Sequence, residues 1–194
     1  MTENPDKFQE ARSILDGQGI QIRQLRRAKV EVQDSSLEKI ARFAVKAASA
    51  SRTGLLVVED SGLFIEALKG FPGAFSSYVY KTIGLKGILS LMHDKPKRNA
   101  YFQTSIAVAS TNVPPRVFTG TVRGSVSREI RGTAGFGYDP IFIPEGFRET
   151  FGQTKTEFKN KTSHRARAFL KFANWYNRSP AGRHRVKTHK RALK

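Results

Sequence analysis

Residues 55–60, Leu-Leu-Val-Val-Glu-Asp, decide the fold class of this 194-residue chain. Four consecutive apolar residues are typical of a strand that is covered on both faces, as in sheets packed between helices. The strand is expected to end on the acidic pair Glu59-Asp60. Two adjacent carboxylates beside a buried strand are costly to desolvate, so a cation or the proton of a water molecule is expected to compensate them. An ordinary Asp-Ser-Gly turn at residues 60–62 is the alternative.

Segments on both sides of this strand have helical or strand periodicity. Helices are expected over residues 7–15, 37–50, 86–92 and 164–176. Ser35 is the predicted N-cap of the second helix and Ser163 that of the last. Strands are expected at residues 101–109, 116–122, 126–130 and 141–143, separated by turn sequences that indicate an antiparallel section. The order of these elements predicts one α/β domain with a mixed sheet.

Composition narrows the class of protein. The formal net charge is +18 and cysteine is absent, which excludes disulfides and thiolate metal sites and favours a hard cation as any bound metal. No acid occurs in residues 178–194, so these are expected to form a disordered basic tail after a domain spanning residues 1–177. Nucleic acid would be contacted only through this tail. Without a membrane-length apolar run or a signal peptide, the protein is expected to be soluble and cytoplasmic.

Two segments place polar groups beside helix N-termini, where α/β proteins bind phosphates. In residues 2–7, Thr-Glu-Asn-Pro-Asp-Lys, a hydroxyl, an amide and an ammonium group precede a helix, although Thr-x-Asn is also an ordinary capping sequence. In residues 159–165, Lys-Asn-Lys-Thr-Ser-His-Arg, positive charge opposes the helix dipole and therefore indicates a bound anion. A solvated basic turn is the alternative for this second segment.

Residues 135–140, Gly-Phe-Gly-Tyr-Asp-Pro, combine glycines, aromatic rings and a carboxylate. Glycines allow close approach of the backbone, and the rings offer a face to a nucleobase. No phosphate-loop or dinucleotide fingerprint is present, which argues against kinases and dehydrogenases. A triad of Ser61, His164 and Asp139 can be written down, but Ser61 lacks the nucleophile-elbow sequence, and His164 has no second histidine at zinc-site spacing.

Taken in order, five motifs resemble the inosine/xanthosine triphosphate pyrophosphatase family over about residues 2–175. They are Thr-x-Asn-x-x-Lys at 2–7, Glu-Asp-Ser-Gly-Leu at 59–63, Phe-Pro-Gly at 71–73, Gly-Phe-Gly-Tyr-Asp-Pro-Ile-Phe at 135–142 and Lys-Asn-x-x-Ser-His-Arg at 159–165. The resemblance implies an α/β fold with an elongated mixed sheet and two lobes around a nucleotide cleft. It also implies a homodimer and Mg²⁺-dependent hydrolysis of inosine, deoxyinosine and xanthosine triphosphates to a monophosphate and pyrophosphate, which removes them from the nucleotide pool.

The same resemblance implies a role for each matching residue. Those expected to contact the phosphates are Thr2, Asn4 and Lys7. Glu31 and Asp60 would serve Mg²⁺, with Asp60 also the general base, and Ser61 would help to hold the substrate. The residues expected to face the base and sugar are Phe136, Gly137, Tyr138 and Asp139. The residues expected to recognise the 6-keto edge of the purine or an adjacent phosphate are Lys159, His164 and Arg165.

One departure from the family concerns the N-terminus. Family members carry an apolar strand directly before Thr-x-Asn, whereas this sequence begins at Met1-Thr2. The first strand of the sheet is therefore expected to be missing, and a start placed too late in the reading frame is the preferred explanation. Two other functions remain open: a nucleic-acid-binding protein that has kept the fold and lost the reaction, and a pyrophosphatase for modified pyrimidine nucleotides.

Overall fold

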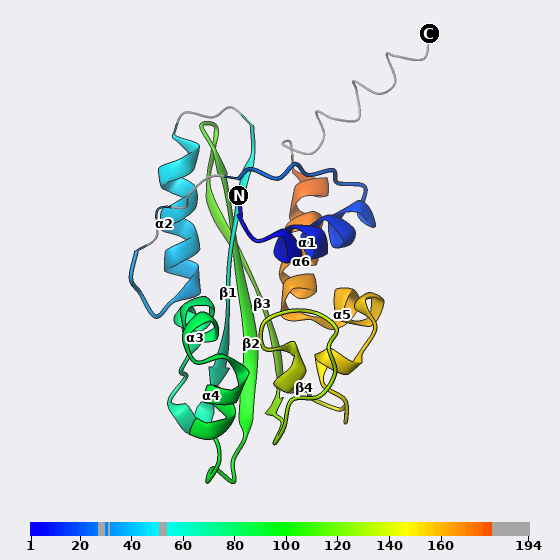
Figure 1. The fold of residues 1–194 in the computed structure, drawn as a ribbon. Coiled ribbons are helices and arrows are strands. Elements are labelled where there is room, and N and C mark those ends of the chain that lie inside the picture. The colour runs from blue at the N-terminus through cyan, green and yellow to red at the C-terminus, as the bar shows by residue number, and fades with distance from the viewer. Residues whose placement is uncertain (27–29, 31, 51–53, 180–194) are drawn as a thin grey trace.

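The computed structural model describes residues 1–26, 30, 32–50 and 54–179, built around a four-stranded sheet in the order β1-β2-β3-β4 (Figure 1). The strands are β1 (Leu56–Ile65), β2 (Asn99–Ser110), β3 (Val113–Val126) and the short β4 (Phe142–Pro144). The expected α/β architecture and elongated sheet are confirmed. A mixed sheet was expected, but each pair of neighbouring strands among the described residues is antiparallel.

The prediction that the first strand ends on Glu59-Asp60 is wrong. β1 continues to Ile65 because Leu63 and Ile65 alternate into the core beyond the acids, and Asp60 pairs with Ser105 of β2 within the ladder. The strand predicted at residues 126–130 is also wrong. Val126 is the last residue of β3, after which the Ser127 N–H donates to the carbonyl of Ile141 and the chain leaves the ladder.

Helices were predicted well where they are long. The observed helices are α1 (Pro5–Asp16), α2 (Leu37–Ser49), α3 (Ser76–Thr82), α4 (Gly84–Leu91), α5 (Thr156–Thr162) and α6 (His164–Arg178). Ser163 caps α6 as expected, whereas α2 is capped by Ser36, one residue after the predicted Ser35. Sequence periodicity missed α3 and α5, because seven residues hold too few repeats to establish a helical pattern. The residues after 179, which include most of the predicted tail, lie outside the described part of the chain.

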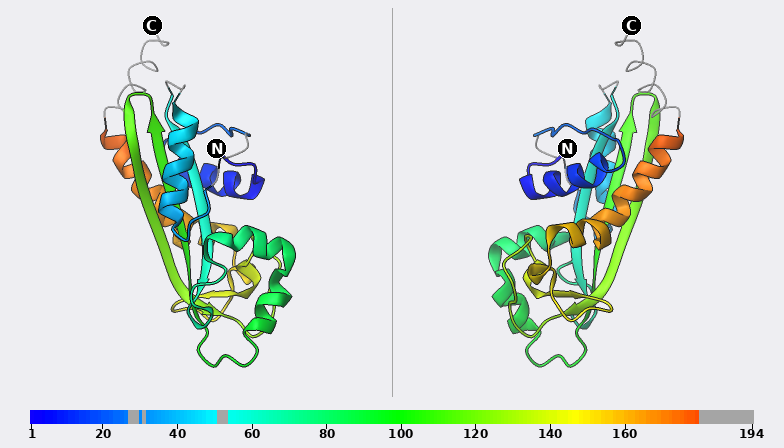
Figure 2. Two further views of the ribbon diagram at one scale, coloured as in Figure 1. Left: turned by 90° about the vertical axis from the view of Figure 1, so that its left-hand side faces the viewer. Right: turned by 90° about the vertical axis from the view of Figure 1, so that its right-hand side faces the viewer.

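Helices cover both faces of the sheet (Figures 1 and 2). Because side chains alternate along a strand, Val58 and Ala107 pack on one face in a cluster with α2, and Ile106 and Val108 pack on the other with α1 and α6. At the far end of the long strands, Leu63, Ile65 and parts of α3, α4 and β4 form a separate core. The molecule therefore has two lobes, which are joined by the extended β1-β2-β3 ribbon.

α6 packs closely against β3, and two of its side chains reach backbone carbonyls of that strand. A Cβ atom at Gly120 would lie 2.1 Å from the carbonyl oxygen of His164 and 2.5 Å from the backbone nitrogen of Ala168, so only glycine allows this close approach. Arg167 Nη1 donates to the carbonyl of Thr121 at 2.9 Å, and Lys171 Nζ donates to that of Thr119 at 2.7 Å. Among the described residues, no helix combines the length and apolar character needed to span a membrane.

Candidate functional site

A cleft of about 480 Å³ lies between the two lobes and is lined by residues of α1, β1, α3, α5 and α6 and by the loop at residues 135–139. It brings together residues that the sequence analysis singled out in four separate segments. Those that line it are Asn4, Lys7, Ser61, Phe136, Gly137, Tyr138, Asp139, Lys159, His164 and Arg165. The structure thus brings these segments together at one cleft, while their roles toward a substrate stay a prediction.

The other predicted site residues lie elsewhere. Thr2 lines a neighbouring hollow of about 340 Å³ that shares Lys7 with the cleft, and its hydroxyl accepts from the Asn4 N–H at 3.1 Å. Asp60 follows Glu59 in β1, so its side chain points to the opposite face of the sheet. Glu31, the other predicted metal ligand, lies outside the described residues.

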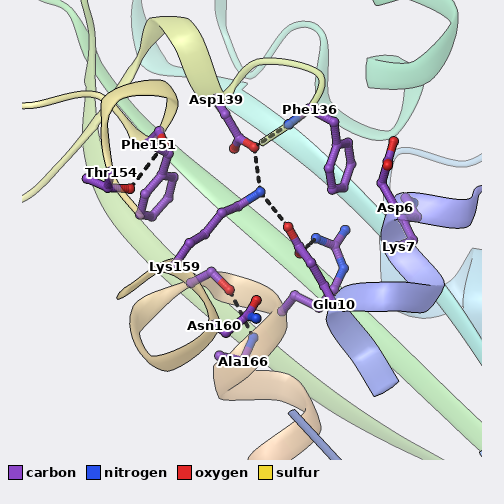
Figure 3. Close-up of polar contacts among 12 residues, drawn as sticks. Asp6, Lys7, Glu10, Phe136, Asp139, Phe151, Thr154, Lys159, Asn160 and Ala166 are labelled. Carbon is purple, nitrogen blue, oxygen red and sulfur yellow. Dashed lines mark hydrogen bonds and ion pairs between the residues drawn. The ribbon is translucent and has the colours of Figure 1, made fainter. Parts of the chain in front are cut away.

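Buried charges form the floor of the cleft (Figure 3). Lys159 Nζ lies 2.6 Å from Glu10 Oε1 and 2.5 Å from Asp139 Oδ2, and all three side chains are nearly inaccessible to solvent. Charge-assisted contacts of this length are strong, and they are required here because a buried ammonium group without partners would be very costly. Lys159 therefore joins α5 to α1 and to the loop that carries Asp139.

Arg165 makes the second set of buried contacts. Its guanidinium binds Glu10 Oε2 at 2.5 Å and Glu59 Oε1 at 2.8 Å, and it donates to Ser61 Oγ at 3.0 Å. Lys7 Nζ lies 3.8 Å from the same Glu59 oxygen. Burial raises the pKa of Glu59, but Arg165 and Lys7 outweigh this effect and lower it to about 2. Glu59 is thus ionised at neutral pH and serves to hold Arg165 in place.

Glu10 is the central residue that sequence reasoning missed. Its two carboxylate oxygens bridge Lys159 and Arg165, which come from different helices. A signal was present: Glu10 lies one turn after Lys7 and next to Ala11, on the side of α1 that is buried. A carboxylate on the buried side of a helix is rarely found without a cationic partner, so it could have been paired with the cations at residues 159–165.

The loop at residues 135–139 is held by its own aspartate. Asp139 Oδ2 accepts from the Phe136 N–H at 2.8 Å, and Gly135 has a positive φ of 73°, where a Cβ would lie 2.1 Å from that same oxygen. The Phe136 ring has Lys159 Nζ at 4.5 Å and the Arg165 guanidinium at 5.3 Å from its centroid. The ring is thus fixed at the cleft in a position suited to stacking on a flat base.

The role of facing the base and sugar stays a prediction for Tyr138, which lines the cleft. Its ring is 5% exposed and its hydroxyl donates to the carbonyl of Ser76 at 2.9 Å, which ties the loop to α3. Burial is the main effect that raises the pKa of Tyr138, and the neighbouring Tyr80 adds a smaller one in the same direction. Its hydroxyl therefore stays protonated and acts as a structural donor between the loop and the second lobe.

His164 lies at the first position of α6, with its ring stacked on Phe102 at a centroid distance of 4.5 Å and an angle of 11°. Burial lowers its pKa well below the ordinary value, and the nearby cations Arg165, Lys159 and Lys7 add to this effect. The imidazole is therefore neutral at physiological pH. Its Nδ1 is buried without a partner among the described residues, so the ring keeps unused hydrogen-bonding capacity at the cleft.

The opposite face of the sheet carries a row of oxygen groups beginning at Asp60. Asp60 is paired with Ser105, which is paired in turn with Thr119. The Thr119 hydroxyl donates to Glu38 Oε1 at 2.8 Å. No group of three or more metal-binding side chains occurs in the described ranges. Mg²⁺ in nucleotide enzymes uses one or two carboxylates together with substrate phosphates, and the partly exposed Asp60 carboxylate suits such a site chemically.

The chain is similar to known proteins over most of its length. The chain matches the Ham1 family over residues 1–175. It is 47% identical over 175 residues to the dITP/XTP pyrophosphatase of Thermococcus kodakarensis, covering 90% of this chain and 94% of that protein. It is 46% identical over 175 residues to the enzyme of the same name from Saccharolobus solfataricus, covering 90% of this chain and 91% of that protein.

Solved structures agree with the sequence comparisons. The Ham1 protein of Staphylococcus aureus superposes with a TM-score of 0.77 at 25% identity, covering 89% of this chain and 94% of that one. A HAM1 protein from Coxiella burnetii gives a TM-score of 0.75 at 26% identity with the same coverage. The fold, the order of the motifs and the extent of the similarity agree, and the chain therefore belongs to the Ham1 family.

Proposed function

We propose that this protein hydrolyses non-canonical purine nucleoside triphosphates, namely the inosine, deoxyinosine and xanthosine triphosphates, to the monophosphate and pyrophosphate. The observation that carries the proposal is the buried charge network beneath Phe136, in which Lys159 and Arg165 are fixed beside a neutral His164. Relatives over most of the chain are named dITP/XTP pyrophosphatases, and this supports the same substrate class here.

Base recognition follows from the fixed donors. Lys159 and Arg165 carry only N–H donors, and His164 can present a further donor, so this corner of the cleft suits the 6-keto oxygen of hypoxanthine or xanthine. Adenine presents an amino group at that position and would leave buried donors unpaired, which costs about 1–3 kcal/mol for each one. Phe136 would stack on the base, and Asp139 would act by holding Phe136 and Lys159 in position.

The phosphate chain would lie toward the N-terminus of α1. Asn4 Oδ1 caps α1 by accepting from the N–H groups of Asp6 and Lys7, and the chain before it carries the Thr2 hydroxyl. Thr2, Asn4 and Lys7 would bind the phosphates there, beside Ser61 at the cleft wall. Asp60 and Glu31 would hold Mg²⁺, which supplies charge neutralisation of the phosphates when bound.

Asp60 is the proposed general base, and this role requires the phosphate chain to pass around β1, the outer strand of the described sheet, to the face that carries Asp60. Its carboxylate would orient a water molecule and take its proton as the water oxygen bonds to the α-phosphorus, while the bond from that phosphorus to the bridging oxygen breaks and pyrophosphate leaves. The network residues would contribute by positioning rather than by proton transfer. Glu59, with its low pKa, remains an anion throughout and keeps Arg165 oriented.

The test is pyrophosphate release from a panel of nucleoside triphosphates with Mg²⁺. We expect inosine and xanthosine triphosphates to be cleaved faster than adenosine triphosphate, and Asp60→Asn to lose activity by orders of magnitude without loss of folding. Glu38→Gln is a matched control, because Glu38 is a carboxylate on the same face of the sheet with its own hydroxyl partner. Equal rates on inosine and adenosine triphosphates would contradict the proposed specificity.

The family resemblance also supports a homodimer. Large apolar side chains are exposed on the lobe that contains α3 and α4, and such a surface is suited to a protein contact. They include Phe71, Phe75, Tyr78, Ile83 and Leu91. Light scattering during size-exclusion chromatography should give twice the mass of one chain, and Tyr78→Lys at the most exposed of these positions should lower that mass.

A further inference from the structure

The cations on the inner wall of the cleft are already matched by carboxylates. Lys7, Lys159 and Arg165 supply three positive charges, and Glu59, Glu10 and Asp139 supply three negative charges in direct contact with them. A triphosphate brings several further negative charges into this site. The inner wall can therefore offer directed N–H donors, but it has no net positive charge with which to balance the phosphates.

The opposite wall, formed by α3, carries an exposed cation that is not paired with a carboxylate among the described residues. Lys81 lines the cleft and is exposed, and within the described ranges it makes no ion pair. Ser77 lies one helical turn earlier and lines the same cleft, so a hydroxyl and an ammonium group occupy one stripe of the helix. Tyr80 lies beside this stripe of α3, and its ring contacts that of Tyr138 edge-on with a distance of 5.5 Å between the ring centroids.

We propose that Lys81 is a phosphate-binding residue of this enzyme, which reaches across the cleft from α3 to the triphosphate of the nucleotide held on the inner wall. This inference rests on the proposed function, since it concerns the same substrate. Lys81 suits the task because its long side chain can follow a mobile phosphate chain, and because binding requires no carboxylate partner to be displaced. Ser77 adds a hydroxyl donor to the same stripe.

Asp6 carries a negative charge at the same cleft and can therefore be compared with the positively charged Lys81. Its carboxylate also lines the cleft, from the first turn of α1 beside Lys7, and it is exposed (Figure 3). Like charges across a cleft repel, so Asp6 should weaken triphosphate binding to about the extent that Lys81 strengthens it. Neither side chain is part of the buried network, so either charge can be removed without disturbing the fold.

The experiment compares Lys81→Met and Asp6→Asn with the parent protein, with inosine triphosphate and Mg²⁺ as substrate. Lys81→Met should raise KM about five- to tenfold, the size expected of a partly exposed charge-assisted contact, and leave kcat nearly unchanged. Asp6→Asn should lower KM. Lys81→Arg should stay close to the parent, and Lys86→Met on α4, which removes a charge away from the cleft, is the matched control.

Inhibition by products adds a second readout. Pyrophosphate should inhibit Lys81→Met less strongly than it inhibits the parent, whereas inhibition by the nucleoside inosine should be unchanged. An unchanged KM in Lys81→Met, or a loss of kcat at constant KM, would overturn the inference while the parent enzyme remains active. A parent protein that neither binds nor cleaves inosine triphosphate would overturn the proposed function and this inference with it.

Discussion

The two walls of the cleft are built on different physical principles. On the inner wall, Lys159 and Arg165 are 3% and 2% exposed, and their charges are fixed by carboxylates from α1, β1 and the 135–139 loop. On the α3 wall, Tyr80 and Lys81 are exposed. The Tyr80 ring contacts that of Tyr138, whereas Lys81 makes no ion pair within the described residues. One wall is rigid and electrically balanced, and the other is open and carries a spare positive charge.

We infer from this difference that the inner wall would determine specificity and that the α3 wall would contribute affinity. Reading the edge of a purine requires donors held to within a fraction of an ångström, and buried paired charges provide such donors at a high cost in desolvation. Binding a flexible phosphate chain requires charge rather than exact placement, which an exposed lysine supplies. Substitutions on the inner wall should therefore affect folding and selectivity together, and those on the α3 wall should affect binding alone.

Arg165→Met should have the largest effect on stability. It removes the cation that binds both Glu10 and Glu59, and an uncompensated buried charge costs about 3–5 kcal/mol in the free energy of unfolding. Urea denaturation would measure the change. Arg167→Met, two residues later on the exposed side of α6, is the control and should cost less than about 1 kcal/mol. Similar losses of unfolding free energy in the two variants would contradict the view that the buried charges of the inner wall are more important for stability than an exposed charge on α6.

Acid should weaken the inner wall through Glu59. Its pKa is about 2 in the folded protein and 4.5 in the reference state, so the stabilisation is fully present above pH 4.5 and is lost as the pH falls toward 2. The loss amounts to roughly 3 kcal/mol. Unfolding free energies measured between pH 6 and pH 2.5 should show this decline, and Glu59→Gln should show a shallower one. An equal slope in the two proteins would contradict the assignment.

Tyr138→Phe tests the junction between the two walls. The variant loses the hydroxyl that donates to Ser76, and one neutral hydrogen bond contributes about 1 kcal/mol. We expect a loss of this size in thermal or urea unfolding, together with a higher KM, because the 135–139 loop is no longer tied to α3. A stability loss without any change in KM would separate the loop anchor from substrate binding.

The smallest effect is expected on the α3 wall itself. Lys81→Met should change the free energy of unfolding by no more than about 0.5 kcal/mol, because the side chain is exposed and makes no ion pair within the described residues. Differential scanning calorimetry would measure it. A loss approaching that of Arg165→Met would show that Lys81 has a structural role and that the contrast between the walls is wrong.

Much of the site could be predicted from the sequence because its residues lie in short motifs at the ends of elements. Asn4 and Ser163 were visible as N-caps, and His164 and Arg165 follow directly at the start of α6. The parts that could not be predicted depend on long-range pairing. Glu10 acquires its meaning only when α5 and α6 bring cations to it from about 150 residues away.

The extent of β1 illustrates the same limit within the fold. The apolar run at residues 55–58 indicated a strand, but the acids that follow it resembled a terminus. They remain inside the strand because Arg165 and Lys7 compensate Glu59 on one face, and Ser105 and Thr119 provide a polar row opposite on the other. A local pattern carries no information on such partners, which come from β2, β3 and α6.

The contacts of Arg167 and Lys171 with the edge of β3 have a consequence for behaviour at high concentration. An open strand edge displays free backbone groups to which the edge of another molecule can be added, and this leads to aggregation. Here two side chains of α6 occupy the carbonyls of Thr121 and Thr119, and their positive charges would repel an identical edge. The helix that carries His164 and Arg165 on one side thus also helps to protect the protein from self-assembly through its longest strand.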